Sequence, residues 1–146
     1  MSLVRDEGKY QEILENIEQY SIKVSKLIEN INNCKNGKIF IYTPNHLGDY
    51  AGTDFLQIIL EHNGYCKKDL EGTRMIQKNS FNKKLTPKSP DFKGYYTVAI
   101  RGKLFENYIT NFNLNNNTFG EEIKILIGTM QEGVSLSNIR QVHIME

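Results

Sequence analysis

Short apolar runs that alternate with amphipathic stretches constrain the fold of this chain more than any other feature. The runs Lys38–Thr43, Tyr95–Ile100 and Ile123–Ile127 are rich in β-branched and aromatic residues, which is typical of strands buried on both faces. We expect a fourth run, Gln141–Met145, to be a buried strand as well. Because strands that alternate with helices form parallel sheets, the sequence predicts an α/β fold with a mainly parallel sheet and helices on both faces.

Three stretches carry the helical pattern, in which apolar residues recur every three or four positions. They run from Lys9 to about Asn33, from Asp49 to Asn63 and from Lys103 to Phe112. The turn-forming pairs Asn36-Gly37 and Asn63-Gly64 follow the first two stretches and predict where these helices end.

The stretch from Cys66 to Gly94 breaks the alternation. It holds two of the three prolines and only scattered apolar residues, so we expect a solvated surface insertion at about residues 67–94. Its basic and aromatic residues would also suit phosphate and base-stacking contacts, and composition alone does not decide between the two interpretations. These residues are Arg74, Lys78, Phe81, Lys83, Lys84, Lys88 and Lys93.

The overall composition narrows the function classes. A length of 146 residues fits one domain, and a formal net charge of +1 gives no large basic field, so any contact with nucleic acid must be local. No apolar run approaches the roughly 18 residues of a membrane span. Cys34 and Cys66 lie far apart without a C-x-x-C partner, which indicates reduced thiols. We expect a cytoplasmic protein without a membrane partner, a disulfide or a metal site.

The loop from Gly128 to Ser135 is the strongest candidate for a binding site. It is polar, contains a second glycine at Gly133, and follows a predicted strand, so it would lie at the carboxyl edge of the sheet, where α/β folds bind ligands. Backbone N–H groups in a turn that leaves a sheet can bind an anion, and a neighbouring hydroxyl can bind a phosphate oxygen. The residues alone are also compatible with a simple turn.

A family resemblance enters with the sequence N-x-R-Q-V-H-I-x-E over Asn138–Glu146. Together with the preceding strand and loop, it resembles motif V and the following strand in the second RecA-like domain of superfamily 2 helicases. The resemblance is to the branch carried by large nucleocytoplasmic DNA viruses, which includes the poxvirus transcription-associated ATPases. A pattern that recurs in this branch ahead of the motif V strand is matched by Phe112, Asn113, Asn117 and Gly120.

The resemblance implies a RecA-like three-layer α/β/α fold and a role for each loop residue. Thr129, with the backbone of Gly128, would bind a nucleic-acid phosphate. Glu132 and Gly133 would face an ATP cleft between two domains, and Ser135 stands where many relatives carry Asp or Ser. The loop is shorter than is usual in this branch.

The resemblance also implies parts that these residues do not include. A helicase ATPase needs a phosphate-binding G-x-x-x-x-G-K-[ST] loop and an acidic metal-binding motif on a first RecA-like domain, and neither occurs here. The sequence also ends before the region of motif VI. We therefore expect residues 1–146 to be a truncated helicase C-terminal domain with no catalytic residue, inactive by itself.

In the parent protein, ATP with Mg²⁺ would bind between this domain and the first RecA-like domain, and a single nucleic-acid strand, DNA or RNA, would cross both. A viral parent would act in the host cytoplasm or the virion. The alternative is a free-standing, non-catalytic α/β interaction module whose insertion contacts a protein partner.

Overall fold

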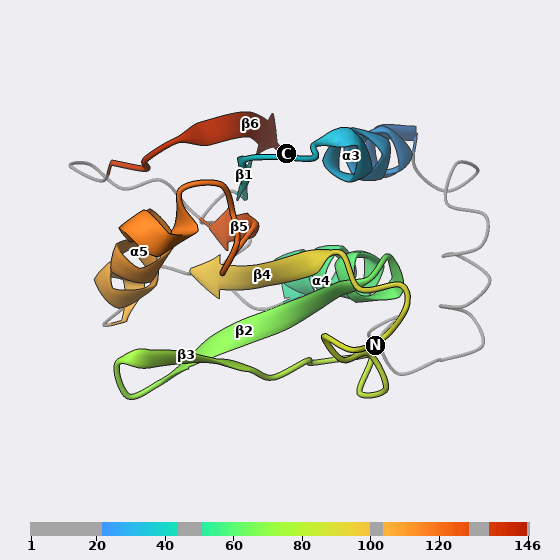
Figure 1. Ribbon diagram of the computed structural model, residues 1–146. Helices are drawn as coiled ribbons and strands as arrows, with labels where there is room; N and C mark the ends of the chain where they lie inside the picture. Colours follow the sequence, from blue (N-terminus) through green and yellow to red (C-terminus); the bar gives the residue numbers. More distant parts are fainter. Residues whose placement is uncertain (1–21, 44–50, 100–103, 129–134, 146) are drawn as a thin grey trace.

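A six-stranded sheet in the order β3-β2-β4-β5-β1-β6 forms the centre of the described chain (Figure 1). The computed structural model describes residues 22–43, 51–99, 104–128 and 135–145. Its helices are α3 (Ile22–Asn33), α4 (Ala51–His62), α5 (Phe105–Asn113) and the short 3₁₀ helix η3 (Asn115–Asn117). Its strands are β1 (Lys38–Tyr42), β2 (Tyr65–Glu71), β3 (Arg74–Gln77), β4 (Gly94–Ala99), β5 (Ile125–Gly128) and β6 (Ile139–Ile144).

Neighbouring strands of the described sheet are parallel, apart from β2 and β3, which form an antiparallel hairpin. β1 lies between β5 and β6, although both of these strands come much later in the sequence. This topology confirms the predicted α/β fold with a mainly parallel sheet, and it is consistent with a RecA-like domain. The predicted runs at β1, β4 and β5 match the observed strands to within two residues at each end.

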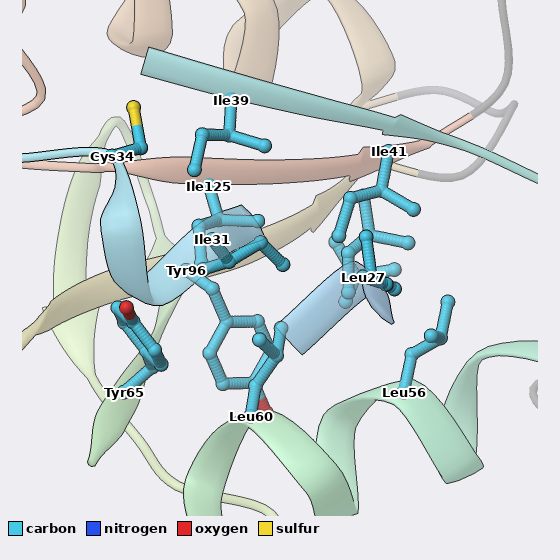
Figure 2. Packing of buried hydrophobic residues seen from close by; sticks show 12 residues of the cluster. Leu27, Ile31, Cys34, Ile39, Ile41, Leu56, Leu60, Tyr65, Tyr96 and Ile125 are labelled. Atoms are coloured by element: carbon cyan, nitrogen blue, oxygen red, sulfur yellow. The ribbon is translucent and has the colours of Figure 1, made fainter. Parts of the chain in front are cut away.

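Helices cover both faces of the sheet. On one face, α3 and α4 bury Leu27, Ile31, Leu56 and Leu60 against strand residues that include Ile39, Ile41 and Tyr96 (Figure 2). Successive side chains of a strand point to opposite faces, so Phe40 points the other way. There it packs with Leu126 of β5 and with Phe105 and Phe112 of α5. The result is three layers with an apolar core on each side of the sheet.

Two lysines are buried at the amino ends of neighbouring strands, and each meets the C-terminal end of a helix. Lys38 is fully buried; its Nζ donates to the Phe112 carbonyl at 2.7 Å and lies 4.4 Å from the Phe112 ring centroid. Lys124 donates to the carbonyl of Cys34, just after α3. Burial lowers the pKa of both lysines, and the negative end of each helix dipole favours their charged form.

The segment from Cys66 to Gly94 differs from the irregular surface insertion expected from its sequence. Its first part forms β2 and β3, and β2 joins the main sheet beside β4. Only Tyr65 and Cys66 of β2 are buried, and the rest of the strand, in which every residue but Leu70 is charged, is partly or fully exposed. A strand that is polar along most of its length lacks the apolar pattern by which strands are recognised.

The second part of this segment is held by a buried carboxylate of α4. Glu61 is 1% exposed, and its side chain accepts the hydroxyl of Tyr96. The same carboxylate accepts three backbone N–H groups, those of Ser80, Phe81 and Asn82, at 3.1, 2.9 and 2.6 Å. The side chain of Asn79, also buried, donates to the carbonyls of Asn82 and Leu85 at 2.8 Å each. The segment is therefore fixed to the domain by its own hydrogen-bond network.

β6 is an edge strand, and the expectation that it is buried is wrong: one of its faces is exposed and the other is only partly buried. Val142 and Ile144 are 59% and 56% exposed. On the other face, Gln141 donates to the Asn30 carbonyl of α3 at 3.1 Å, and the His143 ring nitrogen lies 2.9 Å from the Gln141 side-chain oxygen. Burial lowers the pKa of His143. His143 thus has the structural role of a hydrogen-bonded histidine in a sheet.

Candidate nucleic-acid and nucleotide interface

The carboxyl ends of four parallel strands form one edge of the sheet. The register places Ala99 of β4, Gly128 of β5, Tyr42 of β1 and Ile144 of β6 in one row. The chain leaves this edge through residues 44–50, 100–103 and 129–134, which lie outside the described residues. Ligands of open α/β sheets bind at this edge, so the candidate loop starts where such folds place their sites.

Gly128 ends β5 at a point where a side chain does not fit. Its carbonyl accepts the N–H of Thr43 at 2.9 Å. A Cβ built on Gly128 would lie 2.6 Å from the carbonyl oxygen of Ala99, and this neighbour is backbone that cannot rotate away. The close approach of β4 to β5 therefore requires glycine here, and it fixes the first residue of the candidate loop.

Asn113, the last residue of α5, fixes the other end of the loop. Its side-chain nitrogen donates to the Ser135 carbonyl at 2.8 Å, and its side-chain oxygen accepts the N–H of Ser137 at 2.9 Å. One amide thus binds the backbone on both sides of Leu136, which also packs against the core of the α5 face. The side chain of Asn113 therefore holds the backbone at Ser135 and Ser137 against the end of α5.

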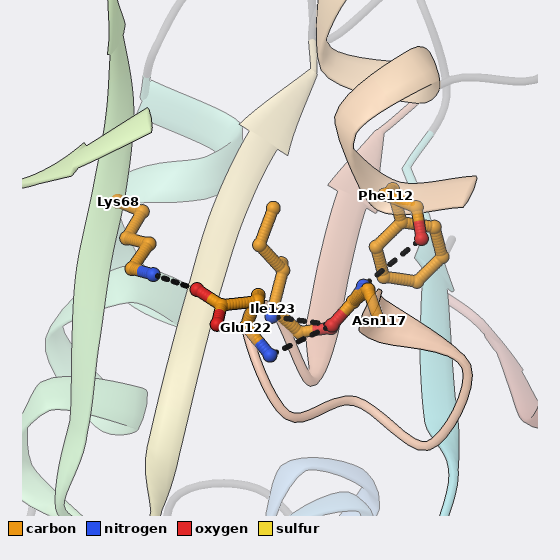
Figure 3. Close-up of polar contacts among 5 residues, drawn as sticks. All are labelled: Lys68, Phe112, Asn117, Glu122 and Ile123. Carbon is orange, nitrogen blue, oxygen red and sulfur yellow. Dashed lines mark hydrogen bonds and ion pairs between the residues drawn. The ribbon is translucent and has the colours of Figure 1, made fainter. Parts of the chain in front are cut away.

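Asn117 in turn fixes the end of α5 relative to β5 (Figure 3). It is fully buried, and its side-chain nitrogen donates to the carbonyls of Phe112 and Ile123 at 2.9 and 3.0 Å. Its side-chain oxygen accepts the N–H groups of Glu122 and Ile123 at 2.9 and 2.7 Å. All four hydrogen bonds of the amide are made, so the turn between α5 and β5 is rigid.

These contacts give a physical reason for the pattern formed by Phe112, Asn113, Asn117 and Gly120. Phe112 is a fully buried core residue, and Gly120 has a φ of +82° with the Lys124 Cα 3.1 Å from a built Cβ. The sequence pattern points to Asn113 and Asn117 but does not reveal what they bind. The partners of Asn113 lie 22 and 24 residues further along the chain.

Of the five predicted site residues, the structure describes two. Gly128 lies in the carboxyl-edge row, and Ser135 is exposed, with its carbonyl bound by Asn113. The hydroxyl of Ser135 makes no hydrogen bond to another described residue. Thr129, Glu132 and Gly133 lie outside the described residues.

The lysine-rich segment lies away from this edge. Lys93 donates its N–H to the Gly64 carbonyl at 2.8 Å, immediately before β2 and β4 begin, so the segment packs at the amino ends of these parallel strands. Its lysines also make local contacts: Lys83 Nζ donates to the Asn79 carbonyl and Lys93 Nζ to the Asn32 side chain. The structure does not bring these lysines together with Gly128.

Among the residues that the structure describes, no cluster of His, Cys, Asp or Glu is arranged to hold a metal ion. Within the described ranges, no helix is long and apolar enough to cross a membrane. Cys34 and Cys66 are both buried and unpaired, and burial raises the pKa of Cys66.

Comparison with known proteins gives one curated relative. The chain is 28% identical over 132 residues to a protein of Acanthamoeba polyphaga mimivirus that is named as a candidate ATP-dependent RNA helicase. The match covers 89% of this chain and 20% of the relative, so the chain spans about a fifth of that protein's length. No protein-family model and no solved structure matches the chain. The comparisons therefore establish similarity to one segment of a helicase-related viral protein.

Proposed function

We propose that this chain is the second RecA-like domain of a superfamily 2, ATP-dependent RNA helicase of the large-DNA-virus branch. In this role it contacts the backbone of a single RNA strand and forms one wall of an ATP cleft, opposite the first RecA-like domain of the parent protein. The similarity to the mimivirus protein supports the class. The choice of RNA comes from the name of that relative.

One observation carries the proposal: both ends of the carboxyl-edge loop are anchored. Gly128 is packed against Ala99 at the start, and Asn113 binds the backbone at Ser135 and Ser137 at the end. The six residues between these anchors include Thr129, Glu132 and Gly133. The two anchors fix where this loop begins and ends at the carboxyl edge of the sheet, the edge at which open α/β sheets bind their ligands.

The residues take the following roles. Thr129 and the backbone at Gly128 bind a phosphate of the nucleic acid. Glu132, Gly133 and Ser135 face ATP, and the exposed Ser135, whose hydroxyl has no described partner, is compatible with a phosphate oxygen. ATP with Mg²⁺ supplies the free energy for movement in the parent protein. The chain itself holds no phosphate-binding lysine loop, so it should not hydrolyse ATP alone.

Binding of a fluorescently labelled oligouridylate to the purified chain tests the nucleic-acid part. We expect weak binding that is reduced by added salt, because phosphate contacts release counterions. Thr129→Ala should weaken it about fivefold. Thr110→Ala is the matched control: it removes the same atoms from an exposed position on α5 and should leave the affinity unchanged.

Two results would contradict the proposal. If the chain bound no oligonucleotide even at low salt, the free-standing interaction module would be the better interpretation. If Thr129→Ala and Thr110→Ala behaved alike, any binding would lie elsewhere on the surface. A phosphate-release assay completes the test, because ATP turnover by the purified chain above background would contradict its assignment as a second RecA-like domain.

A further inference from the structure

A cavity of about 240 Å³ lies between the β2–β3 hairpin and the C-terminal end of α5. Its walls include Arg74 and Met75 of β3, Leu114 and Asn116 after α5, and Ile123 before β5. None of these residues belongs to the carboxyl-edge row or to the candidate loop. The cavity is thus a second feature, one that the proposed helicase function does not use.

The walls of the cavity are held in place by contacts between distant parts of the chain. The Tyr108 hydroxyl of α5 donates to the Asp69 carboxylate of β2, and Met75 packs against the core on the α5 face. Ile123 is fixed through its backbone by the side chain of Asn117 (Figure 3). The hairpin and the helix end therefore form a preorganised recess, which lowers the entropic cost of binding a ligand.

Of the three charged side chains that line the cavity, one makes no ion pair with another described residue. Lys68 and Glu122 both line it and pair with each other at 3.0 Å (Figure 3), and the Lys68 Nζ also lies 4.1 Å from the ring centroid of Tyr95. Arg74 is exposed, and its guanidinium makes no hydrogen bond or ion pair with another described residue. The cavity thus offers one net positive charge, on a group that binds planar anions with two parallel hydrogen bonds.

The rest of the lining combines apolar surface with unused amide groups. Ile123 is 1% exposed and Leu114 is 46% exposed, so an apolar surface extends from a buried side chain to an accessible one. The side chain of Asn116 forms no hydrogen bond with another described residue, and Asn111 uses only its side-chain nitrogen, which donates to the Asn107 carbonyl. A ligand could therefore meet an apolar wall, a guanidinium and an amide in one recess.

We propose that this cavity binds a single carboxylate carried on a short branched apolar group. The unpaired Arg74 would hold the carboxylate, and Met75, Leu114 and Ile123 would contact the apolar part. One cation that makes no ion pair suits a monoanion, whereas a phosphate dianion would face the Glu122 carboxylate with too little positive charge. No aromatic ring is among the described lining residues, so the stacking platform that nucleobases need is missing.

NMR titration of the purified chain with isovalerate tests this proposal. We expect saturable shifts of the amide signals of Leu114 and Asn116, with a dissociation constant on the order of millimolar for so small a ligand. Isovaleramide, which has the same shape without the charge, should bind at least about tenfold more weakly. Isobutyl phosphate should also bind more weakly than isovalerate.

Variants assign the contacts. Arg74→Gln should weaken the binding of isovalerate about tenfold. Arg74→Lys keeps the charge but loses the planar guanidinium, so its affinity should lie between those of the unmodified chain and of Arg74→Gln. Lys88→Gln makes the same change of charge at an exposed site in the segment after β3 and should have no effect. Amide spectra of each variant without ligand confirm that it is folded.

The outcomes separate clearly. Equal affinity for isovalerate and isovaleramide, unchanged binding by Arg74→Gln, or no saturable shift in the unmodified chain would each overturn the proposal. Tighter binding of N-acetyl-leucine than of isovalerate would assign the natural carboxylate to a peptide C-terminus, and the reverse order would assign it to a free small acid. Oligonucleotide binding at the carboxyl edge is measured separately, so failure here leaves the proposed function untouched.

Discussion

The side chain of Asn113 binds the chain on both sides of Leu136, accepting the N–H of Ser137 at 2.9 Å after donating to the Ser135 carbonyl at 2.8 Å. This pair of hydrogen bonds links the end of α5 to the end of the candidate loop. Through these two bonds α5 holds Ser135, a residue predicted to meet a ligand, at a fixed place beside the sheet.

Removing this amide should weaken ligand binding more than it weakens the fold. For Asn113→Ala we expect oligonucleotide affinity to fall about fivefold and the free energy of unfolding to fall by about 1 kcal/mol, since both hydrogen bonds are partly solvated. Fluorescence anisotropy and urea unfolding measure the two effects. Asn107→Ala, at an exposed position of the same helix, is the control. A loss of stability without any loss of affinity would show that the loop does not depend on this anchor.

Gly128 should tolerate no side chain. The Cβ of Gly128→Ala would lie 2.6 Å from the Ala99 carbonyl oxygen, so β4 and β5 would have to separate, at a cost of about 3 kcal/mol. Gly72→Ala is a useful comparison because Gly72 has a φ of +66° and nothing within 4 Å of a built Cβ. That variant meets only backbone strain, about 1 kcal/mol. Urea midpoints that ranked the two variants in the opposite order would contradict the close packing of β4 and β5.

Glu61→Gln should release the segment that follows β3. The three backbone N–H groups of Ser80, Phe81 and Asn82 point at the carboxylate, and an amide offers one oxygen where they need two. We expect a loss of about 2 to 3 kcal/mol and new cleavage sites for trypsin at Lys83, Lys84 or Lys88. Glu29→Gln, which alters an exposed pair with Lys26 at 3.3 Å, should change neither stability nor cleavage. Equal protease resistance of the two variants would argue against this anchoring.

Alkaline pH should destabilise the domain through its buried tyrosines. Burial raises the pKa of Tyr65 from 10.0 to about 12, and burial with the nearby Glu61 carboxylate raises that of Tyr96 as well. The folded chain therefore keeps protons that the unfolded chain loses above pH 10, and stability falls as the pH rises through that window.

Tyr65 alone accounts for about 3 kcal/mol of this loss. Urea unfolding at a series of alkaline pH values, compared with Tyr65→Phe, measures it: the variant loses a hydrogen bond to Asn32 but should show a shallower decline with pH. The comparison also removes the opposite trend from Lys38 and Lys124, whose lowered pKa values make stability rise with pH below 10.5. An equally steep decline in Tyr65→Phe would mean that Tyr65 ionises freely in the fold.

The sequence predicts the buried part of the fold and little of its edges. Apart from Lys38, strands such as Lys38–Tyr42 and Ile125–Gly128 carry no charged residue because both faces are covered, and local composition reports this directly. β2 escapes prediction because it is polar beyond Cys66. The half-exposed β6 looks buried because Val142 and Ile144 are apolar although one face of this edge strand is uncovered.

The candidate site divides in the same way. The local sequence pattern is enough to place Gly128 at the end of a strand and at the start of a loop. The anchoring role of Asn113 does not, since its partners Ser135 and Ser137 become neighbours only when α5 packs on the sheet. Glu61 is similar: its sequence position indicates an ordinary helix residue, and only the tertiary fold shows that it holds another segment.

The position of β1 between β5 and β6 also affects how the chain folds during its synthesis. On the ribosome, β1 is synthesised long before either neighbour, and its apolar side chains have no partner strand until Ile125–Gly128 and then Ile139–Ile144 have emerged. A sheet whose centre closes last folds slowly, because contacts distant in sequence must form together. Nascent chains that stall before β5 would therefore expose an unpaired apolar strand that is prone to aggregation, and we expect chaperones to bind them.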